Sequence, residues 1–216
     1  MTSPARIGIL GGTGAQGRGL ARRLARAGHE VLIGSRDADR ASAAAAELSA
    51  DGTVHGVINA EAAAADLVIV AVPYDGHRDL LVSLAGPLTG KIVIDCVNPI
   101  GFDKQGPYPL TVSAGSAAQE AQEALPGSTV IGAFHHVSAA LLDDPEVETV
   151  DLDVLVLGED RAAVTTVCDL AEDIVGVRGI YGGRLRNAGQ VEALTANLIS
   201  VNRRYKSHAG IRVTDI

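Results

Sequence analysis

The sequence predicts an α/β fold: a Rossmann-type doubly wound parallel sheet joined to a small C-terminal α/β domain. Short apolar runs that end at glycine or proline alternate with stretches of helical periodicity, as in parallel strands joined by helical crossovers. Hydrophobic residues make up 47% of the chain but aromatic residues only 3%, so small aliphatic side chains must fill the core. Strands buried on both faces of a sheet have this composition. The length of 216 residues is sufficient to bury such a core.

We place the first domain at residues 1–134. Its strands are expected in the apolar runs at 6–10, 30–33, 53–58, 66–72, 91–96 and 128–134. Its helices are expected at 16–27, 38–49 and about 77–84. The segment 98–113 carries three prolines and two glycines, and we expect a long irregular loop there, of the kind that forms lids and binding sites.

The second domain is placed at residues 135–216, where the pattern of elements changes. Strands are expected at 152–157 and 177–181, and helices at 161–174 and 188–208. Asn187 and Gln190 have the spacing of a capping box for the last helix, and Gly210 is expected to end it.

The net charge of −8 argues against nucleic acid as a partner. The charge is uneven, however, because residues 178–212 hold seven basic residues and a single acid, Glu192. This basic stretch suggests local attraction for an anionic ligand. Cations that favour a solvated helix end are an equally good explanation.

Cys96 and Cys168 have no partner at disulfide or metal-ligand spacing, so we expect free thiols in a reducing compartment and no metal site. Charged residues interrupt every apolar run, so no membrane span is expected. The first six residues lead directly into a strand and leave no room for a signal peptide. Together these features predict a cytoplasmic protein.

A glycine turn marks the first candidate site. Gly12, Gly14 and Gly17 follow an apolar strand and precede a helix, the arrangement that binds a dinucleotide pyrophosphate at a helix N-terminus. We expect Gly12 to permit the tight turn, Gly14 the close approach of phosphate, and Gly17 the packing of helix on strand.

The residues after the second strand specify the dinucleotide. An NAD site usually has an acid there for the ribose 2′-hydroxyl, whereas this chain has Ser35 and Arg36, with Arg40 one helical turn later. Two guanidinium groups and a hydroxyl can surround a 2′-phosphate, so the sequence favours NADP(H). Asp37 and Asp39 are expected to cap the following helix.

The remaining polar residues give few candidates for proton chemistry. The chain lacks the Ser, Tyr and Lys arrangement of carbonyl reductases, which suggests an acceptor that is itself a redox cofactor. His29, His55, His77 and His208 are expected to be solvated, and Asp95 is expected to cap a loop.

Several motifs together resemble one family, the NADPH-dependent reductases of the deazaflavin coenzyme F420. The motifs lie at residues 11–14 with Gly17 and Gly19, at 34–36, 72–74, 134–140 and 191–195. The resemblance implies hydride transfer between C4 of the nicotinamide and C5 of F420, in a protein that is commonly a homodimer. It also implies that Thr13 and Gln16 lie along the pyrophosphate. Val72 and Pro73 would touch both rings, and the deazaflavin side would be lined by His135 and Val137.

His135 is the one candidate for a catalytic role, that of orienting or polarising the deazaflavin ring. The chain departs from the family at Ser138, where the family has proline, and at His136, where it has threonine. Both lie beside the expected deazaflavin face. An altered deazaflavin, a flavin, or a small imine or carbonyl compound is therefore an alternative acceptor, and a non-catalytic NADP(H) sensor is an alternative from another class.

Overall fold

The computed structural model describes residues 3–216. Met1 and Thr2, the start of the segment in which no signal peptide was expected, lie outside the described residues. The strands of the main sheet are β1 (Arg6–Leu10), β2 (Glu30–Ser35), β3 (Val54–Ile58), β4 (Leu67–Val70), β5 (Ile92–Asp95), β8 (Thr129–Gly132), β9 (Leu152–Leu157) and β10 (Val177–Gly183).

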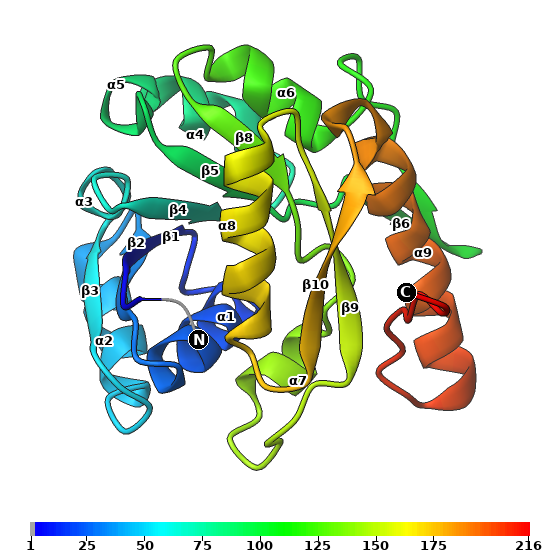
Figure 1. The fold of residues 1–216 in the computed structure, drawn as a ribbon, viewed down its shortest axis with the longest axis horizontal. Coiled ribbons are helices and arrows are strands. Elements are labelled where there is room, and N and C mark those ends of the chain that lie inside the picture. The colour runs from blue at the N-terminus through cyan, green and yellow to red at the C-terminus, as the bar shows by residue number, and fades with distance from the viewer. Residues whose placement is uncertain (1–2) are drawn as a thin grey trace.

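Helices cover both faces of this sheet (Figure 1). They are α1 (Ala15–Arg26), α2 (Ala38–Glu47), α3 (Asn59–Ala62), α4 (His77–Ser83), α5 (Ala85–Leu88), α6 (Ala117–Ala124), α7 (Ala139–Asp143), α8 (Arg161–Glu172) and α9 (Ala188–Tyr205), with a 3₁₀ turn at Leu185–Asn187 before α9. Among residues 3–216, no helix is long and apolar enough to cross a membrane.

The strand order confirms the predicted fold class. Six strands run β3-β2-β1-β4-β5-β8, all parallel, which is the doubly wound Rossmann order. The order reverses between β1 and β4, which pair directly with each other. Ligands of such sheets bind in the crevice at the carboxyl ends of the strands beside this reversal.

The C-terminal strands extend the same sheet. β9 pairs antiparallel with β8 through Gly132 and Leu157, and β10 pairs parallel with β9. Residues 135–216 therefore share a sheet with residues 1–134. The division into two domains at residue 134 stays a prediction.

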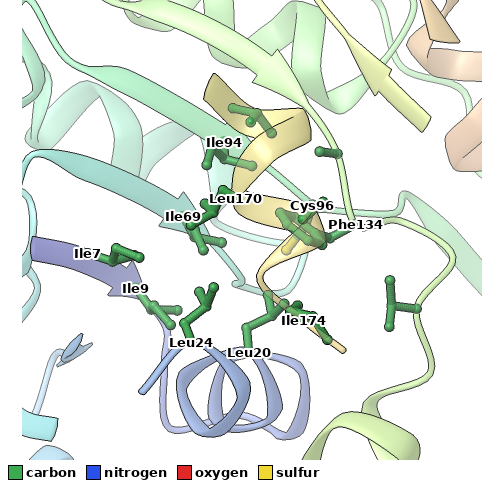
Figure 2. Packing of buried hydrophobic residues seen from close by; sticks show 14 of the residues in the cluster. Ile7, Ile9, Leu20, Leu24, Ile69, Ile94, Cys96, Phe134, Leu170 and Ile174 are labelled. Carbon is green, nitrogen blue, oxygen red and sulfur yellow. The ribbon is translucent and has the colours of Figure 1, made fainter. Parts of the chain in front are cut away.

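Two apolar clusters hold the layers together. Figure 2 shows the first, in which Leu24 of α1 and Leu170 of α8 pack with Ile7, Ile69 and Ile94 from the strands. These side chains are almost wholly inaccessible to water. The second cluster joins the opposite face of the sheet to α3, α4, α5 and α6. Burial on both faces explains why the strands read as continuous apolar runs.

The expected irregular loop at 98–113 is wrong in part, because an antiparallel hairpin forms there from β6 (Ile100–Asp103) and β7 (Gly106–Pro109). The Asp103 carboxylate accepts hydrogen bonds from the backbone N–H groups of Gln105 and Gly106, and Gly106 has a φ of 122°. This turn chemistry closes the hairpin. The hairpin lies against α9 (Figure 1).

The end of α9 also differs from the prediction. The helix stops at Tyr205 because Lys206 adopts the left-handed conformation, with a φ of 52°, well before Gly210. The expected capping box is wrong, since the Asn187 side chain makes no capping hydrogen bond. The short helices α3, α5, α6 and α7 were not predicted.

Candidate functional site

The glycine turn lies at the end of β1, beside the reversal of strand order. Gly11 takes the left-handed conformation, with a φ of 72°, so Gly11 and not Gly12 makes the tight turn. Gly12 is required for packing instead, since a Cβ there would lie 2.9 Å from the Ile9 carbonyl oxygen. A Cβ at Gly17 would lie 2.6 Å from the Cα of Gly12, so Gly17 lets α1 pack on the turn as predicted.

The N-terminus of α1 carries no capping side chain. Its N-cap residue is Gly14, and no acid lies in its first turn, whereas α2 is capped by Asp37 and α8 by Asp160. A Cβ at Gly14 would find only the Gly11 carbonyl oxygen, at 3.6 Å. The N–H groups of Gly11, Gly12 and Gly14 are hydrogen-bonded within the protein. The first turn of α1 has no side-chain cap, so its N–H groups remain available, which fits the pyrophosphate of a dinucleotide.

The residues predicted for the 2′-phosphate line a cavity of about 310 Å³ together with the glycine turn. We call it the Arg36 pocket; it is lined by Gly11, Thr13, Gly14, Ser35, Arg36, Arg40, Asn59, Ala71, Val72, Pro73, Asp75, Gly76 and Leu80. Both guanidinium groups are exposed, and within residues 3–216 no hydrogen bond or ion pair occupies them. Asp37 does not compete for them, because its carboxylate accepts the N–H groups of Asp39 and Arg40 as the cap of α2.

Asn59 belongs to the same pocket and was missed by the sequence reasoning. Its side-chain oxygen accepts the backbone N–H of Gly11 at 3.3 Å, which fixes the glycine turn. A Cβ at Gly34 would lie 2.8 Å from that oxygen. A lone asparagine after the third strand gives no signal of this contact, because it depends on how β2 and α3 pack.

A second cavity, of about 300 Å³, adjoins the first through Gly14, Val72 and Pro73. We call it the Gln16 pocket; it also contains Ala15, Gln16, Ala71, Cys96, Val97 and Asn98. The Gln16 side chain donates to the Phe134 carbonyl oxygen at 3.3 Å. The expected place of Gln16 along the pyrophosphate stays a prediction.

His135 lies at the junction between the sheet and α9. Its backbone oxygen accepts hydrogen bonds from Asn98 Nδ2 at 3.0 Å and from Thr195 Oγ1 at 3.3 Å. The preceding residue, Phe134, has a φ of 62°, a strained conformation for a non-glycine residue. These bonds hold the turn that aims the imidazole.

The His135 ring is buried, yet neither ring nitrogen has a hydrogen-bond partner among the described residues. Burial lowers the pKa of His135 to about 4, so the imidazole is neutral near pH 7. A buried, unpartnered polar ring is costly and is usually matched by a ligand or water. Residue His135 lines a cavity of about 250 Å³, the His135 pocket, with Gln16, Asn98, His136, Val137, Ser138, Ala139, Thr195, Leu198, Ile199, Asn202 and Ala209.

The two positions that depart from the family motif are held by α9 and the segment after it. His136 donates from Nε2 to the Val191 carbonyl oxygen at 2.6 Å, and burial lowers its pKa. The hydroxyl of Ser138 lies 3.2 Å from Nδ1 of His208. Both contacts fasten the wall of the His135 pocket to the C-terminal part of the chain.

The expectation that His77 is solvated is wrong. The His77 ring is fully buried, 2.6 Å from the Asp95 carboxylate and 3.3 Å from that of Glu120. Asp95 does cap the following turn, by accepting the Val97 N–H, but its other oxygen binds His77. The sequence separation of these residues gave no sign of the cluster.

The expectation for His29 is also wrong, because its ring is buried. Its Nδ1 accepts the Ala5 N–H, and its Nε2 lies 3.2 Å from Asp173. His55 is exposed, as expected. His29 thus ties the start of β1 to the end of α8.

Part of the basic C-terminal stretch is used within the protein. Arg178 and Arg212 both bind the buried carboxylate of Asp153, and Arg184 lies 3.4 Å from Glu159. Arg203 lies over the ring of Phe102, 5.7 Å from its centroid. The ion pairs of Arg178, Arg184 and Arg212 explain their presence without a ligand.

Both cysteines are free thiols, as predicted. Cys96 is buried and its thiol donates to the Val70 carbonyl oxygen, and burial raises its pKa far above the usual value. Cys168 is partly buried, and burial raises its pKa to about 11. Across residues 3–216 no group of three potential ligands is arranged to hold a metal ion.

Comparisons with known proteins agree on one family. Residues 6–99 match the family model described as NADP oxidoreductase coenzyme F420-dependent. The F420-dependent NADP reductase of Methanothermobacter thermautotrophicus is 40% identical over 222 residues, covering 98% of this chain and 95% of that protein. The protein of the same name from Methanocaldococcus jannaschii is 39% identical over 223 residues, covering 98% and 99%.

A solved structure agrees with these relatives. The crystal structure of an Arthrobacter sp. FB24 protein, provisionally named an F420-dependent NADP-reductase, has a TM-score of 0.82 and 29% identity, covering 98% of this chain and 100% of that one. Identity of about 40% over nearly the full length of two relatives is decisive, because the family model alone spans less than half of the chain. The chain belongs to the family of F420-dependent NADP reductases.

Proposed function

We propose that this protein transfers a hydride reversibly between C4 of NADP(H) and C5 of coenzyme F420. The observation that carries the proposal is the continuity of the cavities. The Arg36 pocket, suited to a phosphorylated dinucleotide, adjoins the Gln16 pocket, and the Gln16 pocket shares Gln16 and Asn98 with the His135 pocket. Two ring systems that meet in this crevice would be positioned for direct transfer.

NADP(H) is assigned to the Arg36 pocket and the glycine turn. The Thr13 N–H and the first-turn N–H groups of α1 would receive the pyrophosphate, with Gly14 allowing its close approach. Ser35, Arg36 and Arg40 would hold the 2′-phosphate through charge-assisted hydrogen bonds. The nicotinamide, which supplies the hydride when bound, would lie at Val72 and Pro73. Gln16 would lie along the pyrophosphate, and Gly12 and Gly17 would serve this ligand by shaping the glycine turn.

The deazaflavin is assigned to the His135 pocket, lined by His135 and Val137. The neutral imidazole can donate one hydrogen bond and accept another, so it would orient the ring without adding a charge. The protein would hold the two carbon atoms that exchange the hydride at reacting distance and exclude water from them.

We further infer a cytoplasmic homodimer. Exposed apolar side chains gather on α9, at Leu194, Val201 and Tyr205, and on the neighbouring hairpin, at Phe102 and Tyr108. A patch of this kind supports self-association. The free thiols support a reducing compartment.

The test is anaerobic mixing of the protein and NADPH with F420, and separately with FMN and FAD, following the oxidised chromophore. We expect rapid bleaching of F420 alone. Bleaching of a flavin in preference to F420 would mean that the acceptor is a flavin and that the protein is a flavin reductase. Tight NADPH binding without bleaching of any acceptor would favour an imine or carbonyl acceptor or the non-catalytic sensor.

A further inference from the structure

A chain of four polar side chains leads from the cleft into the core of the sheet. The Tyr74 hydroxyl lies 3.5 Å from Glu120 Oε2, and Glu120 Oε1 lies 3.3 Å from His77 Nδ1. On the other side of the imidazole, His77 Nε2 lies 2.6 Å from Asp95 Oδ2. Tyr74 lies in the loop between β4 and α4, Glu120 in α6, His77 at the start of α4 and Asp95 at the end of β5.

With Glu120 and Asp95 ionised, both nitrogens of His77 carry a proton. A carboxylate oxygen can only accept, so Nδ1–H must donate to Glu120 and Nε2–H to Asp95. The His77 and Asp95 side chains are fully buried, while Glu120 is 16% exposed. The two carboxylates compensate the charge of the buried imidazolium, which burial alone would disfavour.

The surrounding charges support the same protonation state. Burial lowers the pKa of His77, but the charge of Asp95 and the carboxylate of Glu120 outweigh it and raise the pKa above its usual value. Burial, and then the charge of Glu120, raise the pKa of Tyr74, so its hydroxyl keeps its proton. Glu192 of α9 also faces the cluster, and burial raises its pKa to about 7.

The outer end of the chain, at Tyr74, opens into a wide cavity. This cavity, of about 780 Å³, is lined by Tyr74 and Glu120, and we call it the Tyr74 cavity. It shares Asn98, Thr195 and Ile199 with the His135 pocket, and it shares Pro73 with the Arg36 pocket. A proton at the Tyr74 oxygen is therefore adjacent to the space assigned to both rings.

We propose that Tyr74 donates the proton that the reaction consumes and that His77 resupplies it through Glu120, with Asp95 as a positioning residue. The inference rests on the proposed function, whose balance is NADPH + F420 + H⁺ giving NADP⁺ + F420H₂. The hydride forms the new C–H bond at C5, and the Tyr74 O–H bond breaks as its proton passes to a ring nitrogen of the acceptor.

The proton lost by Tyr74 is then replaced. His77 Nδ1–H gives its proton to Glu120, and Glu120 passes it to the Tyr74 oxygen, which leaves His77 neutral and still donating to Asp95. Glu120 takes up the next proton from water in the cavity and returns it to His77. In the reverse direction each transfer runs backwards, so the four residues consume or release one proton for each hydride.

The test compares Tyr74→Phe and Glu120→Gln with two matched controls at exposed positions, Tyr181→Phe on β10 and Glu123→Gln on α6. We expect Tyr74→Phe to lower kcat for F420 reduction by about 100-fold or more, to abolish the solvent deuterium isotope effect, and to leave the NADPH Kd within twofold. Glu120→Gln should move the alkaline limb of the kcat profile to lower pH. Neither control should change these values.

A measurement that does not depend on turnover accompanies the kinetics. Nitrogen-15 NMR of the ligand-free protein should show two protonated nitrogens on His77 at pH 7, and the Glu120→Gln variant should lose one of the protons at a lower pH than wild type. Retention of wild-type kcat and isotope effect by Tyr74→Phe, or a neutral His77 at pH 7, would overturn the proposal. Failure of the wild-type protein to bleach F420 would instead overturn the proposed function, and the relay with it.

Discussion

Arg36 and Arg40 illustrate how much a local motif can predict. The two side chains and Ser35 lie within a few residues of one another, so their meeting at one pocket follows from the strand-to-helix turn that carries them. His77 and Asp95 could not be found in this way. Their contact depends on the pairing of β4 with β5 and on the packing of α4, and no pattern in the sequence encodes it.

We predict that Arg36→Ala and Arg40→Ala each raise the KM for NADPH about 10- to 100-fold and leave that for NADH within about twofold. Each change removes a charge-assisted hydrogen bond to the 2′-phosphate, worth about 1.5–3 kcal/mol. Initial rates with both nucleotides measure the effect, and Arg161→Ala, an exposed arginine of α8, is the control. An equal loss for NADH would mean that the arginines do not read the 2′-phosphate.

We predict that His135→Ala lowers kcat/KM for F420 at least tenfold, because the ring that orients the acceptor is removed. The NADPH Kd should stay within about twofold of wild type, since the imidazole lies apart from the Arg36 pocket. Fluorescence titration with NADPH and F420 bleaching separate the two readouts. Loss of NADPH binding in the variant would show that His135 supports the fold of the crevice instead.

At the scale of elements, α6 and α9 are joined by one buried carboxylate. Glu192 accepts the N–H groups of Ala117 at 2.9 Å and Ala118 at 3.1 Å, so a side chain of α9 caps the N-terminus of α6. The helical periodicity of α9 was sufficient to predict the helix but not this contact. The sequence of α6, AAQEAQEA, has high helix propensity, yet no helix was predicted there because the segment follows a predicted loop.

We predict that Glu192→Ala lowers the free energy of unfolding by about 2–3 kcal/mol, because two buried N–H groups lose their acceptor. Glu192→Gln, which keeps one acceptor oxygen, should lose less. Urea unfolding of both variants measures the difference. Glu123→Gln, on the exposed face of α6, is the control and should unfold at the same urea concentration as wild type.

The same carboxylate makes stability depend on pH. The pKa of folded Glu192, about 7, lies above the ordinary value of 4.5, so the folded protein binds a proton that the unfolded chain releases between these values. The stability that this proton contributes is complete below pH 4.5 and is lost as the pH rises through 7, by about 3 kcal/mol in all. Relative to Glu192→Gln, wild type should therefore gain stability from pH 7 to 4.5, and a constant difference would contradict the assignment.

At the scale of the whole molecule, the alternation of strands and helices predicted the Rossmann order but not the continuation of the sheet. β9 meets β8 through one antiparallel residue pair, and such a short contact leaves no periodic signal. The C-terminal segment is then fastened to this edge, because Asp153 of β9 binds Arg178, Arg212 and the Val213 N–H. Ala209 of the same segment lines the His135 pocket.

We predict that Asp153→Asn lowers the free energy of unfolding by about 1–3 kcal/mol and raises the KM for F420. The loss is moderate because both arginines are more than one third exposed. Hydrogen bonds from Arg178 hold the pKa of Asp153 below its usual value, so its contribution is present near neutral pH and is lost as the pH falls through that lowered pKa. Urea unfolding and F420 kinetics, with exposed Asp169→Asn as the control, measure both effects.

Asn98 stands where three of the cavities meet, in the walls of the Gln16 pocket, the His135 pocket and the Tyr74 cavity. Because these cavities adjoin at Asn98, the ligand that binds first forms part of the binding surface for the second. A hydride that crosses directly between them requires both to be resident at once. Initial velocities measured at several fixed concentrations of F420 should give double-reciprocal lines that intersect, and parallel lines would mean that NADP⁺ departs before the acceptor enters.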